Sequence, residues 1–250
     1  MVDRTEAGRL AVLAARHDLP GDAAGQLATL LDLLARDPAA PTAIRDRRAV
    51  LDDHLADSLV ALDVPGVRKA RSLVDLGSGA GLPGLPLAIG LPEASVSLVE
   101  SSERKCAFIA RALAACGIGN AGVVHARAES WPAGLGRFDV ATARALAPLE
   151  VIVEYAAPLL VVGGTLVAWR GKRDPAGEAV AEEAAAIVGL TLGPVLPVTP
   201  YEGAQHRHLH LMSKVMDTPD RFPRRPGMAV KRPLSGISGR SRPWSDRVRR

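Results

Sequence analysis

The sequence predicts an α/β fold with a mostly parallel seven-stranded sheet, a C-terminal antiparallel hairpin and an N-terminal helical cap. After Arg71, short apolar β-like runs alternate with helical segments, which is typical of a parallel sheet covered by helices on both faces. The last two β-like runs have no helical segment between them, which indicates a hairpin. The residues before position 63 show helical periodicity instead.

Each expected element follows from its own apolar pattern. The predicted strands cover residues 72–76, 95–100, 122–125, 138–142, 165–169, 192–198 and 208–215. The predicted helices between them cover residues 85–90, 103–116, 149–160 and 176–188. Before them, two helical stripes lie on either side of a Pro-rich break at residues 37–41; the stripes are Leu27, Leu30, Leu31 and Leu34, then Val50, Leu51, Leu55, Leu59 and Leu62. We therefore expect a helical cap over residues 1–62, a cofactor-binding domain over 63–216 and a basic, disordered tail over 217–250.

Composition limits the class of protein. The chain has no apolar run of about 18 residues that could span a membrane. Its charged N-terminus lacks the apolar block of a signal peptide, so we expect a cytoplasmic protein. The two cysteines, Cys106 and Cys116, lie too far apart on one predicted helix to pair, and no Cys/His cluster suggests a metal. We expect a monomer without a metal.

The net charge of +4 conceals an uneven distribution. Residues 221–250 contain ten basic residues and one acidic residue, whereas the first 220 residues contain 21 basic and 26 acidic residues. A tail of this kind suits a polyanion such as RNA. The structural alternative is a solvated tail that contributes only solubility.

The motif DLGSGAGLPGL, at residues 75–85, follows an apolar run and precedes a helical one. It predicts a strand, a tight glycine turn and a helix, where bare N–H groups can bind a nucleotide-type cofactor. Gly79, Gly81 and Gly84 match the dinucleotide fingerprint GxGxxG, which leaves an NAD-dependent oxidoreductase open. Asp75 disfavours an NAD-binding site, since a carboxylate at this strand end would repel a pyrophosphate.

Asp75, Gly77 and Gly79 form DxGxG, the loop of S-adenosylmethionine-dependent methyltransferases, and the terminal hairpin resembles the arrangement in those enzymes. Glu100 ends the second predicted strand, where a carboxylate can accept hydrogen bonds from both ribose hydroxyls. Ala128 and Glu129 follow the third strand and would flank the adenine. A surface acid at the start of the next helix is the alternative for Glu100.

Four strings in this order resemble the RsmG family, also called GidB: HLADSL at 54–59, the glycine loop with LVESSERKCAFI to residue 109, FDVATARALAPL at 138–149 and WRGK at 169–172. The resemblance covers about residues 25–215, and the tail looks like the extension of actinobacterial members. The chain departs from the family at residues 35–38 and 40–43, within the predicted cap, where members usually carry Trp-Asn and Asn-Leu-Thr strings. The family methylates N7 of a guanine in 16S small-subunit ribosomal RNA.

The resemblance implies a Rossmann-like class I methyltransferase that binds S-adenosyl-L-methionine and acts on 16S ribosomal RNA or the small ribosomal subunit. It places the cofactor contacts at Gly77, Leu82, Glu100, Ala128, Glu129 and Arg144. Asp75 and Gly79 join this set through the DxGxG loop.

The chemistry needs no general base, since guanine N7 offers an in-plane lone pair near neutral pH. Arg144 follows the fourth predicted strand, at the sheet edge where ligands of open α/β folds bind, and is the expected positioning residue. An ion pair with Glu150 or Asp139 is its structural alternative. We expect the phosphate contacts to come from four basic side chains; these are Arg127, Lys172, Arg224 and Arg225.

His54 and Asp57 share one helix face, and their role stays open between an RNA contact, support for the cofactor loop and an interhelical hydrogen bond. A catalytically silent RNA-binding or ribosome-assembly factor is a further alternative for the whole chain. In either RNA-binding case, we expect the tail to carry RNA affinity without affecting cofactor binding.

Overall fold

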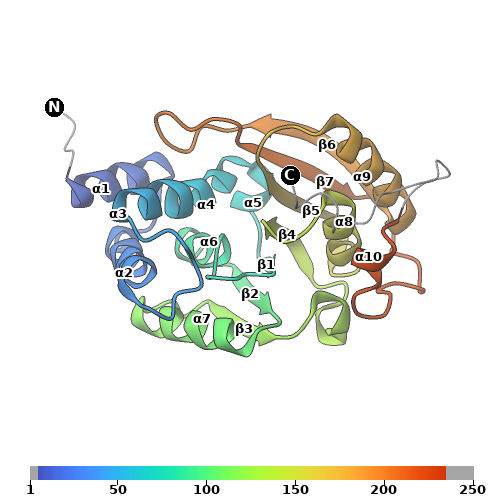
Figure 1. Cartoon of the computed structure of the whole chain (residues 1–250), viewed down its shortest axis with the longest axis horizontal. Coiled ribbons are helices and arrows are strands. Elements are labelled where there is room, and N and C mark those ends of the chain that lie inside the picture. The colour runs from blue at the N-terminus through green and yellow to red at the C-terminus, as the bar shows by residue number, and fades with distance from the viewer. Residues whose placement is uncertain (1–4, 235–250) are drawn as a thin grey trace.

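The computed structural model describes residues 5–234 and has one seven-stranded sheet at its centre (Figure 1). The strands are β1 (Ser72–Leu76), β2 (Ser95–Glu100), β3 (Ala121–His125), β4 (Phe138–Arg144), β5 (Leu160–Arg170), β6 (Leu190–Pro197) and β7 (His208–Lys214). Their order across the sheet is β3-β2-β1-β4-β5-β7-β6. The first five strands run parallel, and β7 runs antiparallel to both β5 and β6. The predicted fold class is confirmed.

Helices cover both faces of the sheet (Figure 1). The N-terminal elements are α1 (Glu6–Arg16), α2 (Ala23–Arg36), α3 (Arg47–Ala49), η1 (Val50–Ala56), α4 (Asp57–Leu59), η2 (Val60–Asp63) and α5 (Pro65–Arg68). Those that follow are α6 (Gly84–Gly90), α7 (Glu103–Ala115), η3 (Ala128–Ser130), η4 (Pro132–Gly134), α8 (Leu149–Ala156), α9 (Pro175–Val188) and α10 (Met228–Lys231). Within residues 5–234, none of these helices is long and apolar enough to cross a membrane.

Alternating side chains of the central strands divide the core into two layers. On β1, Leu73 packs with the N-terminal helices, α6 and α7, while the next residue, Val74, packs with α8 and α9. Every leucine and valine of the two predicted helical stripes is buried. The N-terminal helices therefore share a hydrophobic cluster with one face of the sheet.

The strand β5 begins five residues earlier than predicted, and α8 ends at Ala156 rather than at residue 160. The reason is the pair Gly163 and Gly164, which resembles a turn in the sequence. In the structure this pair lies beside a register shift between β4 and β5. A Cβ on Gly164 would lie 3.0 Å or less from the carbonyl oxygens of Val161 and Asp139, so the strand continues because a bare backbone fits here.

The first part of the predicted tail packs on the protein body, in contrast to the expected disorder. Phe222 is buried in the cluster that α8 and α9 form with the sheet, and Arg224 forms an ion pair with Glu154 of α8. These contacts supply the apolar burial and charge pairing that a basic arm lacks on its own. The rest of the predicted tail, residues 235–250, lies outside the described residues.

A buried carboxylate fixes the junction between β1 and α6. Asp75 is fully buried, and its Oδ1 accepts a hydrogen bond from the Thr142 hydroxyl of β4 at 2.9 Å. Its Oδ2 accepts the backbone N–H of Gly84, the first residue of α6, at 3.2 Å. Asp75 thus ties two strands to the start of the helix that follows the glycine turn.

This junction has no room for a side chain at Gly84. A Cβ there would lie 2.6 Å from Leu98 Cδ2 and 2.9 Å from Asp75 Oδ2. We expect Gly84→Ala to lower the free energy of unfolding by about 1–3 kcal/mol. Gly25→Ala is the matched control, since Gly25 lies in α2 with nothing within 4 Å of the added Cβ. It should raise the free energy of unfolding by roughly 0.5–1 kcal/mol. Urea unfolding measures both changes. A change of the same sign in the free energy of unfolding of both variants would contradict the tight junction.

The buried Asp75 should also affect how stability depends on pH. Burial raises the pKa of Asp75 from 3.8 to about 6, against the hydrogen bonds from Thr142, Ser78 and Gly84. Between these two values the folded chain binds the proton more tightly, so this contribution to stability is full below pH 3.8 and is lost as the pH rises through 6. The stability of the wild type relative to Asp75→Asn should therefore fall between pH 4 and pH 7, by roughly 2–3 kcal/mol. A difference independent of pH would contradict this assignment.

Candidate active site

The carboxyl edge of the parallel strands brings together three residues predicted for the site. Leu76 of β1 lies beside Val99 of β2 and Ala143 of β4 in the sheet register. The strands therefore end at nearly the same level, where ligands of open α/β sheets bind. The residues that follow these positions are Gly77, Glu100 and Arg144.

The glycine turn after β1 depends on the absence of side chains. Gly77, Gly79 and Gly81 have φ values of +64°, +59° and +81°, in the left-handed region that favours glycine. A Cβ on Gly77 would lie 2.4 Å from Leu146 Cδ1. The backbone of this turn can therefore lie directly against Leu146, which comes from the loop after β4.

Glu100 fixes the turn to the end of β2. Its Oε2 accepts the N–H of Gly79 at 3.0 Å, and its Oε1 accepts the N–H of Ser102 at 2.8 Å. Lys105 of α7 lies 3.9 Å from Oε2. Because each carboxylate oxygen has two lone pairs, Glu100 can accept further hydrogen bonds from a ligand.

A pocket of about 110 Å³ lies next to the turn. It is lined by Gly77, Val99, Ser101, Ala126, Arg127, Ala128, Glu129, Leu146 and Tyr155. The structure thus brings the predicted residues Gly77, Ala128 and Glu129 into one pocket, with Arg127 at the same place. Apolar side chains and a carboxylate around a glycine turn fit an adenosine group, which has flat faces and amine and hydroxyl donors.

An N-terminal helix holds Arg144 at this edge. Nη1 of Arg144 donates to Asp57 Oδ2 at 2.9 Å and to the carbonyl oxygen of Asp53 at 3.2 Å. Its partner is therefore Asp57, and not the alternatives Glu150 or Asp139. Burial raises the pKa of Asp57, and the charge of Arg144 opposes this effect.

His54 belongs to the same polar region but binds elsewhere. Its Nε2 lies 2.8 Å from the Thr42 hydroxyl, in the loop before the helix. Burial and the nearby charge of Arg144 lower the pKa of His54 to about 4. The imidazole is therefore neutral near pH 7, so the positive charges of this region come from Arg144 and Arg207.

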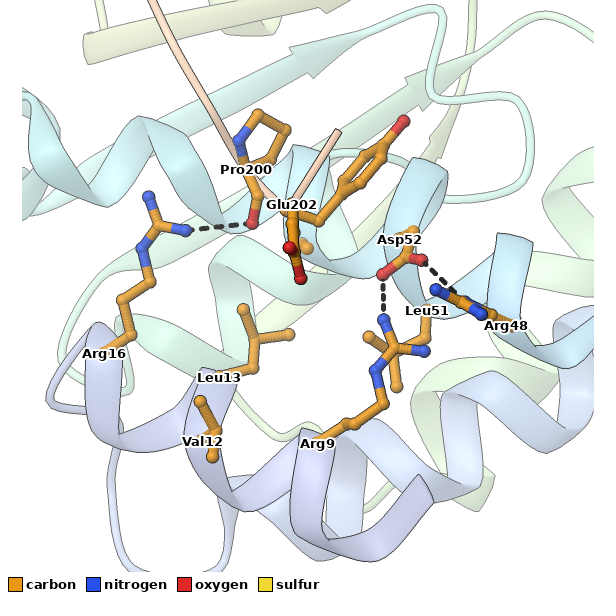
Figure 2. Close-up of a pocket in the computed structure, with 11 residues that line it drawn as sticks. Arg9, Val12, Leu13, Arg16, Arg48, Leu51, Asp52, Pro200 and Glu202 are labelled. Carbon is orange, nitrogen blue, oxygen red and sulfur yellow. Dashed lines mark hydrogen bonds and ion pairs between the residues drawn. The ribbon is translucent and has the colours of Figure 1, made fainter. Parts of the chain in front are cut away.

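A separate groove of about 670 Å³ lies between α1, η1 and the loop that joins β6 to β7 (Figure 2). Figure 2 shows Arg9 and Arg48 pointing to Asp52, and Arg16 pointing to the carbonyl oxygen of Pro200, 2.9 Å away. The groove is therefore basic in composition, but its arginine side chains already have partners. Tyr201, from the same loop, donates to Asp53 and links the groove to the residues around Arg144.

The remaining residues predicted for the site do not line the pocket, and they differ in burial and in their partners. Leu82 is buried in the core, and Lys172 and Arg225 are exposed. The Asp75 carboxylate is buried beneath the turn, so it acts on the site through the shape of the turn rather than as part of the pocket lining. Arg224 points to Glu154.

Several residues around the site were not predicted from the sequence. Leu146 and Tyr155 line the pocket, while Tyr201 and Arg207 surround Asp53. Tyr201 and Arg207 were predictable in part, because the loop of a C-terminal hairpin that ends antiparallel to β5 must lie at the carboxyl edge. Leu146 carried no chemical signal in the sequence.

Known proteins with similar sequences share most of this chain. A family model described as "GidB: rRNA small subunit methyltransferase G" matches residues 29–195. A protein of Rubrobacter xylanophilus named ribosomal RNA small subunit methyltransferase G is 42% identical over 198 residues, which cover 77% of this chain and 76% of that protein. A protein of the same name from Chloroflexus aggregans is 41% identical and covers 77% of this chain and 82% of its own length.

Solved structures agree on the fold. Fibrillarin of Aeropyrum pernix, solved with S-adenosyl-L-methionine, has a TM-score of 0.51 at 15% identity over 63% of this chain and 72% of its own. A SAM-dependent methyltransferase of Aquifex aeolicus has a TM-score of 0.50 at 16% identity, and the match covers 67% of this chain and 93% of that protein. The sheet order, the site at its carboxyl edge and the sequence matches together lead to one conclusion. The chain belongs to the GidB family of rRNA small subunit methyltransferases.

Proposed function

We propose that this S-adenosylmethionine-dependent methyltransferase transfers the methyl group to N7 of one guanine in 16S ribosomal RNA. The observation that carries the proposal is the carboxyl edge, where the glycine turn, the Glu100 carboxylate and the Arg144 guanidinium come together. The 16S substrate is supported by the names of the relatives. We further propose that the enzyme acts as a monomer in the cytoplasm.

The residues around the turn provide contacts to the ribose and the adenine of the cofactor in this proposal. Glu100 accepts the ribose hydroxyls, since its oxygens have lone pairs beyond those used by Gly79 and Ser102. Ala128 and Glu129 hold the adenine in the pocket of about 110 Å³. Gly77, Gly79 and Leu82 shape the turn. When bound, the cofactor supplies an electrophilic methyl group on a sulfonium.

The protein's own contribution to the reaction is alignment rather than proton transfer. Guanine N7 is a nucleophile without deprotonation, so the site must orient the base and exclude water. Arg144 suits this task, because Asp57 and the carbonyl of Asp53 fix its guanidinium at the sheet edge. Its remaining N–H groups would donate to guanine O6 or to a phosphate, since a donor on N7 would block the nucleophile.

Exposed basic residues provide the RNA contacts in this proposal. Arg127 lines the cofactor pocket, and Lys172 and Arg225 are exposed to solvent. None of the three forms an ion pair with another residue of the described range 5–234, so each is available to a phosphate. Arg224 cannot, because its guanidinium already binds Glu154, so we propose a structural role for it instead.

The direct test is methyl transfer from labelled S-adenosylmethionine to small ribosomal subunits that lack the modification. We expect label in 16S RNA, and cleavage at the N7-methylated base followed by primer extension should map it to one guanine. Glu100→Ala should abolish transfer because it removes the carboxylate that holds Gly79 of the turn and that accepts the ribose hydroxyls in this proposal. Gly77→Asp should do the same, since a side chain there overlaps Leu146.

Three outcomes would contradict the proposal. Normal transfer by both variants would reject the cofactor site. Binding of NADH rather than S-adenosylhomocysteine in calorimetry would favour an oxidoreductase, and RNA binding without methyl transfer would favour an assembly factor.

A substitution at Arg144 tests alignment separately from cofactor binding. Arg144→Lys keeps the charge but loses the planar fork of donors, so we expect methyl transfer to fall by about 100-fold. The matched control is Arg48→Gln, because Arg48 belongs to α3, its side chain is 82% exposed and it does not line the cofactor pocket. It should keep normal transfer at saturating RNA. Single-turnover kinetics measure both, and equal rates for the two variants would remove Arg144 from the reaction.

A further inference from the structure

The C-terminal segment of residues 221–234 docks beside the cofactor pocket through a buried ion pair. Glu154 of α8 is 2% exposed, and Arg224 donates to both of its carboxylate oxygens, with Nε 2.6 Å from Oε1. A buried carboxylate without a partner is strongly unfavourable, so Glu154 ties this segment to α8. Phe222 adds apolar contacts to the same side of the sheet.

The docked segment also reaches the pocket directly. The N–H of Gly227 donates to Oε1 of Glu129 at 2.9 Å, and Glu129 lines the pocket. Gly227 has a φ of +79°, and this left-handed turn directs its N–H group toward η3. Tyr155, the residue after Glu154 on α8, lines the pocket as well. The ion pair therefore holds the segment next to Tyr155, and the hydrogen bond holds it next to Glu129. Both of these residues line the same pocket.

These contacts involve only one of the two oxygens of the Glu129 carboxylate. Its Oε2 accepts no hydrogen bond that the structure shows from residues 5–234, while Oε1 is held by Gly227. A carboxylate fixed through one oxygen presents the other in a defined direction, which lowers the entropy that a ligand must lose on binding. An amine donor on the ligand is the group that such an oxygen would accept.

We propose that the C-terminal segment is a structural part of the cofactor pocket, in which Gly227 orients Glu129 so that its free oxygen accepts the amine of the adenine ring. Docking through Arg224 and Glu154 and binding of the cofactor then favour each other by the same factor. This inference rests on the proposed function of the pocket. It replaces the expectation that the tail affects RNA affinity alone.

Calorimetry with S-adenosylhomocysteine on full-length variants tests the coupling. We expect Arg224→Gln and Glu154→Gln to weaken binding at least fivefold, because each breaks the ion pair that holds the segment. The matched control is Lys231→Gln, which removes one positive charge from an exposed residue of the same segment and should leave the affinity unchanged. Equal affinity of the Arg224 and Lys231 variants would overturn the proposal.

A second ligand tests the role of Glu129. S-inosylhomocysteine replaces the ring amine with a carbonyl oxygen, so the wild type should bind it more weakly than S-adenosylhomocysteine. This preference should shrink in Arg224→Gln, whose Glu129 is no longer oriented by Gly227. A preference that is unchanged in the variant would contradict the assigned hydrogen bond, whereas a merely structural ion pair would lower stability without changing selectivity.

Hydrogen exchange on the wild type provides a measurement that does not depend on a variant folding. Addition of S-adenosylhomocysteine should slow exchange in the peptide that covers residues 222–232, and Gly227 should gain the most protection. Unchanged exchange with bound ligand would overturn the coupling. If the wild type binds no S-adenosylhomocysteine at all, the proposed function fails, and this outcome is distinct from the failure of the coupling.

Discussion

The site depends on one buried carboxylate. Asp75 lies inside the protein, yet it joins β1 to Thr142 of β4 and to the first N–H of α6. Without it, the start of α6 would lose its hydrogen bond to β1, and only Ser78, which donates to the Asp75 carbonyl oxygen at 3.0 Å, would still join a turn side chain to that strand. Glu100 plays the same part from β2, through the N–H of Gly79. Two acids therefore fix the shape of a turn that has few side chains of its own.

The second constraint joins the N-terminal helices to the reaction side of the sheet. Asp57 lies at the start of α4, while its partner Arg144 ends β4, 87 residues later in the chain. The indole N–H of Trp169 on β5 donates to the carbonyl oxygen of Asp57 at 2.7 Å, which fixes the backbone as well as the side chain. The N-terminal helices therefore position the guanidinium at the site, in addition to covering one face of the sheet.

Periodicity and glycine spacing predicted the fold and the turn because both depend on local geometry. The stripe that includes Leu27 and Leu34 reports burial directly, and the DxGxG loop reports positive φ angles. The partners of Arg144 and Arg224 could not be predicted in this way. Each ion pair joins residues at least 70 positions apart, and only the packed structure decides which of many acids lies within reach. The Gly163–Gly164 pair resembles a turn, but it lies inside β5 beside a register shift, so this local signal did not mark the start of the strand.

The ion pairs Arg144–Asp57 and Arg224–Glu154 follow one logic. Buried pairs gain little net stability, since the loss of hydration offsets most of the attraction. Their effect is to give one packing arrangement a much lower free energy than similar arrangements, because any shift leaves a buried charge without a partner. In this chain the two pairs accompany the packing of the N-terminal helices and the C-terminal segment on opposite faces of the sheet. Both ends of the described chain are thus packed against elements that carry the site, so a folding defect at either end should disturb the site together with the core.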